Sequence, residues 1–98
     1  MTISKETCDG TLTVTVSGRL DTLTAPELEK QLSLSMPSAD KLVLDLTDLA
    51  YISSAGLRAV LSAHKAMSGK GGMKIVGVND LVREVFDVTG FSNIFTIE

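Results

Sequence analysis

The sequence has little of what several kinds of functional site require. It contains a single cysteine, Cys8, and no tryptophan, and aromatic residues make up only 4% of its 98 residues. One thiol cannot close an intrachain disulfide or supply the several cysteines of a structural zinc site. Because proteins that bind single-stranded nucleic acids stack bases on aromatic side chains, this composition also argues against such a surface.

Basic charge and long apolar runs are scarce as well. The chain has 9 Lys and Arg against 12 Asp and Glu, a net charge of -3. Binding to a phosphate backbone needs a basic surface, so we expect no direct contact with nucleic acid. No apolar stretch approaches the ~18 residues of a membrane span. Residues 1–6 lack the basic and then apolar run of a signal peptide, so we expect a cytoplasmic protein without a membrane span.

The composition that remains is that of one globular domain. Hydrophobic residues make up 44% of the chain and charged residues 21%, with only 2 prolines, which predicts a single compact domain over residues 1–98. Strict alternation from Leu12 to Ser17 predicts a half-buried strand. The preceding Asp9-Gly10 pair is typical of a two-residue hairpin turn that joins this strand to residues 3–7. An antiparallel pair therefore opens the chain.

Helical and strand patterns alternate after the hairpin. Thr24 and Glu27 have the spacing of a capping box, which predicts a helix with Leu28 and Leu32 on its buried side. Residues 41–46 are almost continuously apolar, and this predicts a central strand buried on both faces.

Two more helices are indicated, one over residues 54–68 and one that Asn79 or Asp80 caps and Gly90 ends. The third helix is expected to bury Leu81, Val82, Val85 and Phe86, and further strands are expected at 75–78 and 94–97. This order predicts an α/β fold, with a mixed β-sheet opened by an antiparallel hairpin and with helices on its parallel crossovers.

Two candidate ligand sites are weak. Residues 69–72 are rich in glycine, but they lack the spacing of a phosphate-binding loop and follow a helix instead of a strand. Asp21, Asp45 and Asp48 could gather at strand ends, yet no His or Cys stands beside them. We therefore expect neither a metal site nor a cofactor.

A hydrolytic site is also disfavoured. Ser54 follows a strand and opens a helix, but Ile52 occupies the first glycine position of a nucleophile elbow. His64 is the sole histidine, and it lies ten residues further along the helix, about 15 Å away, too far to serve as a base. Because His64 lies on the apolar side of that helix, we expect it to be a residue at the boundary of the core or a hydrogen-bonded residue within it. We expect no enzyme.

Two adjacent serines begin the second helix. Only one can be the N-cap, a role that contributes about 1 kcal/mol. Ser53 is well placed for it because it follows the apolar Ile52, and this leaves Ser54 at the first helical position with its side chain pointing outward. Ala55 and Gly56 beside it are small, so we expect an exposed surface that another protein can approach closely.

These motifs together resemble a known family. Gly18-Arg19-Leu20-Asp21 leading into Thr24–Leu28, and Leu44-Asp45-Leu46 followed by Ile52–Leu57, are similar to the STAS domain of bacterial anti-sigma factor antagonists. The resemblance covers essentially the whole chain. Many members have Asp before the phosphorylated serine and Ser after it, where this chain has Ser53 and Ala55, a form that resembles other members.

The resemblance implies a partner-switching function. The unphosphorylated protein would bind a serine-kinase anti-sigma factor and so release the sigma factor, and a phosphoserine phosphatase would reverse its phosphorylation. By position the acceptor would be Ser54, with Ser53 as the less favoured alternative. The implied partner-binding residues are Asp21, Thr22, Ser53, Ser54, Ala55, Gly56 and Arg58. The alternative is an unphosphorylated STAS scaffold or adaptor in a transport or signalling complex.

Overall fold

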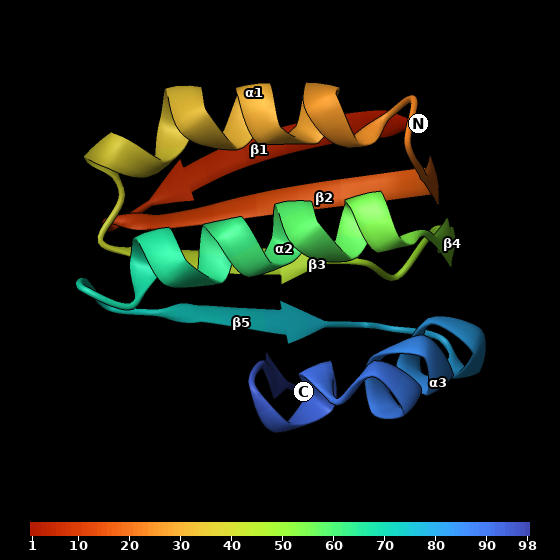
Figure 1. The fold of residues 1–98 in the computed structure, drawn as a ribbon. Coiled ribbons are helices and arrows are strands. Elements are labelled where there is room, and N and C mark those ends of the chain that lie inside the picture. Colours follow the sequence, from red (N-terminus) through yellow and green to blue (C-terminus); the bar gives the residue numbers. More distant parts are fainter.

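Strand β2 (Thr11–Leu20) pairs with three other strands in the computed structural model, which describes all residues from Met1 to Glu98. It pairs antiparallel with β1 (Thr2–Cys8), parallel with β3 (Lys41–Asp45) and, through its last residues, parallel with β4 (Leu49–Ile52). Beyond β3 lie β5 (Met73–Val76) and β6 (Thr96–Ile97), both parallel to their neighbours. The predicted mixed α/β sheet and its opening hairpin are confirmed (Figure 1).

The hairpin turn has the geometry that its sequence predicts. Asp9 and Gly10 adopt φ angles of 51° and 82°. Positive φ at both central positions is the requirement of a two-residue hairpin turn of type I′, and Asp and Gly tolerate it better than most residues. The turn therefore fixes the register of β1 on β2, with Cys8 opposite Thr11.

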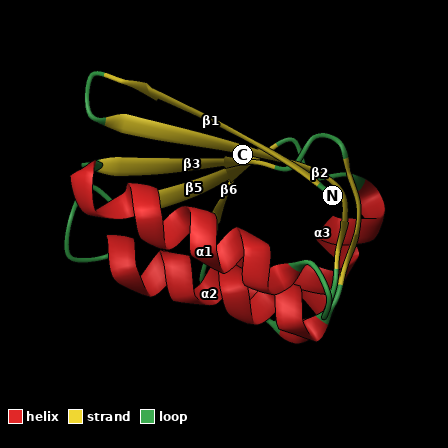
Figure 2. Ribbon diagram, turned by 90° about the horizontal axis from the view of Figure 1, so that it is seen from above, coloured by secondary structure: helices red, strands yellow, loops and turns green.

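Two helices cover one face of the sheet, side by side (Figure 2). They are α1 (Ala25–Ser35), continued by the short helix η1 (Met36–Ser38), and α2 (Ser54–Met67). The third helix, α3 (Asp80–Thr89), packs against β4 and is followed by η2 (Phe91–Asn93). The core lies between α1, α2 and the sheet, and contains fully buried side chains such as Val14, Leu28, Leu44, Val60 and Ile75.

The other face of the sheet carries no helix, and this corrects the prediction that β3 is buried on both faces. Leu42 and Leu44 are buried, whereas Lys41 is exposed and Val43 only partly covered. The uncovered face continues through Thr13 of β2, which pairs with Val43. An apolar run predicts a strand, but it does not specify whether a second layer covers it.

Two strand predictions also need correction, and one strand was missed. Residues 49–52 form β4, a strand that was not predicted, because only Leu49 and Ile52 are buried and the short segment does not alternate. The strand predicted at 75–78 runs from Met73 to Val76 and ends before Gly77, which has a φ of 77°. The last strand is only Thr96–Ile97, because Ile94 and Phe95 form the turn that ends η2, where their N–H groups donate to the carbonyl of Phe91 at 3.0 and 2.9 Å.

Helix α3 confirms its predicted ends. The Asn79 side chain accepts a hydrogen bond from the N–H of Val82 at 2.8 Å, and its amide donates to the carbonyl of Leu49 at 2.8 Å. Gly90 ends the helix with a left-handed φ of 82°. Val82 and Phe86 are buried and Val85 is partly buried, but the expectation for Leu81 is wrong, because its residue is 55% exposed.

One lysine joins the two covering helices at their far ends. The ammonium of Lys70 donates to the carbonyls of Met36, Pro37 and Ala39 at 3.0, 3.1 and 2.8 Å. Carbonyls that follow a helix have no partners within it, and a cation there compensates for them. The loop after α2 is thereby tied to the end of η1. None of the helices has the length and apolar character needed to cross a membrane.

Candidate partner-binding site at the start of helix α2

The two serines at the start of α2 differ in what their hydroxyls do. Ser53 is the N-cap, and its oxygen accepts a hydrogen bond from the N–H of Gly56 at 3.3 Å. Its own N–H donates to the carbonyl of Leu20 at 2.9 Å. Ser54 is the first residue of the helix and is exposed. The prediction that Ser53 is the N-cap is confirmed. The hydroxyl that does not cap the helix is that of Ser54.

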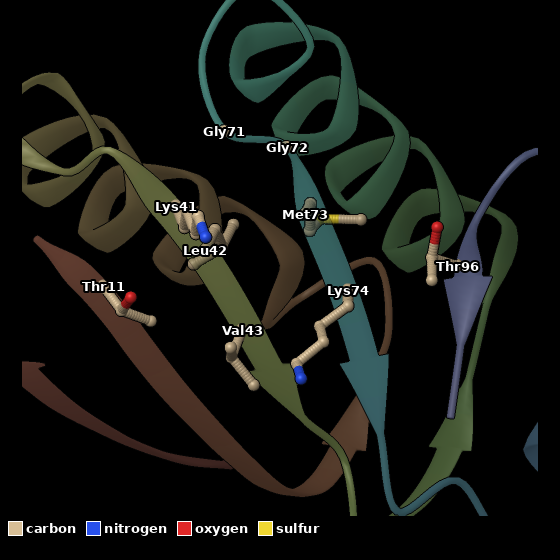
Figure 3. A pocket seen from close by; sticks show the side chains of 9 residues that line it. All are labelled: Thr11, Lys41, Leu42, Val43, Gly71, Gly72, Met73, Lys74 and Thr96. Atoms are coloured by element: carbon tan, nitrogen blue, oxygen red, sulfur yellow. The ribbon is translucent and has the colours of Figure 1, made fainter.

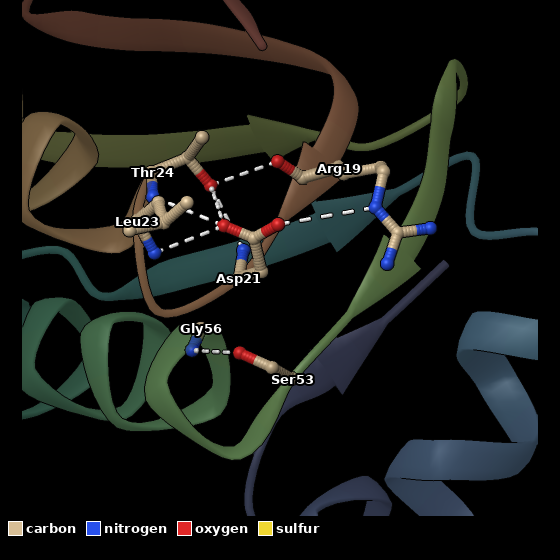
Figure 4. Close-up of polar contacts among 6 residues, drawn as sticks. All are labelled: Arg19, Asp21, Leu23, Thr24, Ser53 and Gly56. Carbon is tan, nitrogen blue, oxygen red and sulfur yellow. Dashed lines mark hydrogen bonds and ion pairs between the residues drawn. The ribbon is translucent and has the colours of Figure 1, made fainter.

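The loop before α1 lies beside this helix start, but it is built differently from the prediction (Figure 4). The expected capping box is absent, because the Thr24 side chain makes no cap hydrogen bond to α1. Its hydroxyl instead accepts from the N–H of Asp21 at 2.8 Å and donates to the carbonyl of Arg19 at 2.8 Å. Thr and Asp side chains often bond to nearby backbone in this way, and such bonds compete with helix capping.

Asp21 organises the loop. One carboxylate oxygen accepts from the N–H groups of Leu23 and Thr24 at 3.0 and 3.1 Å, and the other lies 3.8 Å from Nε of Arg19. The Asp21 carbonyl accepts from the N–H of Ala25 at 2.8 Å, at the start of α1. The aspartate therefore supports the first turn of the helix and the loop that precedes it.

These contacts change the acidity of Asp21. Partial desolvation raises the pKa of its carboxyl, but hydrogen bonds from Thr24 and Leu23 and the charge of Arg19 outweigh it, so that the pKa lies below the ordinary 3.8. A carboxyl with a lowered folded-state pKa stabilises the fold above its unfolded pKa, about 3.9, and loses that contribution as the pH falls through the folded value.

The loop should therefore loosen only in acid. On titration from pH 6 downward, the amide resonances of Leu23 and Thr24 should move together with a midpoint below 3.8. The Asp21→Asn variant, followed by the same NMR titration, should lack this transition. A midpoint at or above the ordinary value in the wild-type protein would contradict the assigned hydrogen bonds.

The structure brings most of the expected binding residues to one end of the molecule. β2 and β4 pair there through Leu20 and Ile52, so the loop after β2 and the start of α2 are adjacent. Thr22, Ser54 and Arg58 are exposed. Asp21, Ser53 and Ala55 are partly buried.

Gly56 is the exception, because it is buried instead of exposed. A Cβ atom there would lie 2.8 Å from Cγ of Leu20, 2.9 Å from Cγ1 of Ile52 and 2.9 Å from the carbonyl oxygen of Leu20. The glycine lets the first turn of α2 pack directly against the ends of β2 and β4. The absence of a side chain at Gly56 is therefore needed for packing within the chain, and it does not make room for another protein.

Three exposed or partly exposed side chains of this region were not predicted. Leu23 at the tip of the loop is 89% exposed, and the Arg19 guanidinium lies 4.3 Å from the centre of the Tyr51 ring, in cation–π contact. The sequence does hold a signal for Leu23, since it is a lone apolar residue between Thr22 and Thr24. The Arg19–Tyr51 contact depends on the parallel pairing of β2 with the unpredicted β4.

The other residues considered for chemistry do not form a site. An Asp45 carboxylate oxygen accepts from the N–H and hydroxyl of Thr47 at 3.0 and 2.6 Å. No group of three or more His, Cys, Asp or Glu is arranged to hold a metal ion. His64 is half-buried beside Phe95, at 5.6 Å between ring centres, so it is a boundary residue, but its Nδ1 is buried without a hydrogen-bond partner.

The largest hollow lies elsewhere, on the face of the sheet that no helix covers (Figure 3). It has a volume of about 470 Å³ and is lined by residues near the starts of β3 and β5, among them Lys41, Val43 and Lys74. Lys74 is paired there with Glu98 at 3.4 Å. Ser53 and Ser54 follow the last residue of β4, at the opposite end of the parallel strands.

Known proteins match the chain along nearly its whole length. The STAS domain family matches residues 2–98. BtrV of Bordetella bronchiseptica, named as a candidate anti-sigma factor antagonist, is 35% identical over 99% of this chain and 85% of its own. The anti-sigma F factor antagonist of Paenibacillus polymyxa is 32% identical over 90% of this chain and 78% of its own.

A solved structure agrees with these sequence matches. The crystal structure of an anti-sigma factor antagonist from Mycobacterium paratuberculosis superposes with a TM-score of 0.88 and 29% identity, over 98% of this chain and 83% of that one. The names of these relatives describe regulatory proteins, not enzymes. The chain therefore belongs to the STAS domain family, among the bacterial anti-sigma factor antagonists.

Proposed function

We propose that this chain, while unphosphorylated, binds a serine-kinase anti-sigma factor in the cytoplasm and so releases the sigma factor. The binding surface comprises the loop at Asp21 and Thr22, the serines at the start of α2, and Arg58 one turn further along. The observation that carries the proposal is the difference between the hydroxyl groups of the two serines. Ser53 is held by its cap hydrogen bond, whereas Ser54 presents a free hydroxyl at the same helix start.

Phosphorylation of Ser54 would act on the partner and leave the fold intact. A phosphoserine carries a charge of about -1.5 to -2, and a helix N-terminus tolerates it because its N–H groups and dipole favour anions. The first turn of α2 contains no acidic residue that would repel it. On the surface shared with the kinase, the new charge would weaken binding, and a phosphoserine phosphatase would restore it.

The test is to identify the partner and the modified residue together. The tagged chain is incubated in a lysate of its source organism with and without ATP, the proteins retained are identified, and phosphate is mapped by tandem mass spectrometry. We expect capture of a serine kinase that also binds a sigma factor, with loss of capture once phosphate appears on Ser54. The Ser53→Ala variant should still accept phosphate, and Ser54→Ala should not.

Circular dichroism of the modified protein provides the control for the fold. An unchanged helix signal is expected because the cap hydrogen bond of α2 is made by Ser53, whereas the modified Ser54 is exposed. Phosphate on Ser53, or a melted helix after modification, would contradict the proposal. A chain that accepts no phosphate and captures transport or signalling subunits would instead be a scaffold or adaptor.

A further inference from the structure

We propose that Leu23 is an apolar anchor of this interface, which inserts into an apolar pocket of the kinase anti-sigma factor, and that Asp21 is the residue that positions it. The inference rests on the proposed function. In this inference Leu23 increases the affinity for the kinase, whereas phosphorylation of Ser54 controls whether the kinase binds.

The exposure of Leu23 is the first observation. At 89% it is the most exposed of the large apolar residues, above Val88 at 79% and Leu34 at 66%. It stands at the tip of the loop between β2 and α1 and belongs to neither the core nor the apolar side of α1. Burying a leucine side chain of this exposure in a partner pocket corresponds to a gain of roughly 10- to 100-fold in affinity.

The second observation is that the loop is held in place. The N–H of Leu23 itself donates to the Asp21 carboxylate at 3.0 Å, and the N–H of Thr24 donates to the same oxygen at 3.1 Å. Thr24 in turn ties the loop to the carbonyl of Arg19 at 2.8 Å (Figure 4). A loop whose backbone is already held in place loses little freedom on binding, which favours affinity.

The third observation is the position of the loop beside the serines. The carbonyl of Leu20, three residues before Leu23, accepts from the N–H of Ser53 at 2.9 Å. A partner that covers Ser54 therefore meets the loop tip as well. Apolar anchors near the centre of an interface commonly contribute most of its affinity, while their neighbours exclude water.

The experiment compares Leu23 with a second exposed leucine, Leu34. The partner is the purified kinase anti-sigma factor captured by the wild-type chain, and affinity is measured by titration calorimetry at two salt concentrations. Leu23→Ala should weaken binding by tenfold or more at both salt concentrations, because the lost contact is apolar. Leu34→Ala, on α1, should bind like the wild type, and Leu23→Met should restore most of the affinity.

A double-mutant cycle tests the positioning role of Asp21. Asp21→Ala should weaken the binding of the wild-type chain, but its effect should shrink to less than about twofold when Leu23 is already alanine, since contacting residues couple. Equal effects of Asp21→Ala in both backgrounds would show that it contacts the partner independently, and would overturn the positioning role.

The outcomes separate this inference from the proposed function. If the wild-type chain binds a kinase anti-sigma factor but Leu23→Ala binds as tightly as Leu34→Ala, the anchor is refuted and the proposed function stands. If the wild-type chain binds no such kinase, both are refuted. Thermal unfolding of each variant provides the control, and Leu23→Ala should keep the wild-type midpoint because its side chain packs against nothing in the core.

Discussion

The Ser54→Asp variant should bind the kinase anti-sigma factor at least tenfold more weakly than Ser54→Ala. Alanine leaves the neutral contact surface nearly unchanged, whereas aspartate places a fixed negative charge where the partner must exclude water, and an unpaired charge in an interface is costly. Titration calorimetry at one fixed salt concentration measures the difference, since salt screens exposed charges. Aspartate carries less charge than phosphate, so this variant gives a lower bound on the effect of phosphorylation.

The matched control is another serine of the same helix. Ser62 is exposed on α2, eight residues and therefore about 12 Å beyond Ser54. Ser62→Asp adds the same charge to the same helix, so it should leave binding unchanged if the position of the charge matters. Equal affinities for Ser54→Asp and Ser54→Ala, or an equal loss for Ser62→Asp, would rule out a charge switch at the helix start.

Gly56→Arg should unfold the protein or lower its free energy of unfolding by about 3 kcal/mol or more, a large fraction of the 5–15 kcal/mol that domains possess. Even a Cβ atom at Gly56 would lie within 3 Å of Leu20 and Ile52, so an arginine must lift the start of α2 off β2 and β4. Gly56→Ala should cost less, about 1–3 kcal/mol. Urea unfolding followed by circular dichroism measures both.

Gly69 provides the control for this prediction. It lies in the loop after α2, and a Cβ atom there would meet nothing within 4 Å. Gly69→Arg should therefore unfold like the wild type. A fully stable Gly56→Arg protein would show that the start of α2 is free to move. The result also bears on binding experiments, because an affinity lost with Gly56→Arg reports a damaged fold and not a blocked interface.

Structural features that depend only on neighbouring residues could be predicted from the sequence. The Asp9-Gly10 turn, the caps at Ser53 and Asn79, and the left-handed Gly90 each need only a few adjacent residues, and all four are present. The alternation in β2 likewise predicts its buried face. The family resemblance added the function and the site, which none of these local signals contains.

Features that depend on distant residues could not be predicted in the same way. Thr24 has the spacing of a cap, but the carbonyl of Arg19 and the N–H of Asp21 compete for its hydroxyl and prevail. Gly56 is expected at a surface from its sequence neighbours, but the ends of β2 and β4 pack against it. Whether a small residue faces solvent or a neighbouring strand is decided by tertiary packing, and one sequence does not specify it.

The pairing of β2 with three strands determines how its backbone amides exchange with solvent. β2 is hydrogen-bonded to β1, β3 and β4, so its amide protons should exchange with solvent only when the whole domain unfolds. The loop after β2 is held mainly by side-chain oxygens of Asp21 and Thr24, so its amides should exchange through small local openings. A partner that binds this loop can therefore rearrange it at the expense of local hydrogen bonds alone, while the sheet and the start of α2 packed on it stay protected.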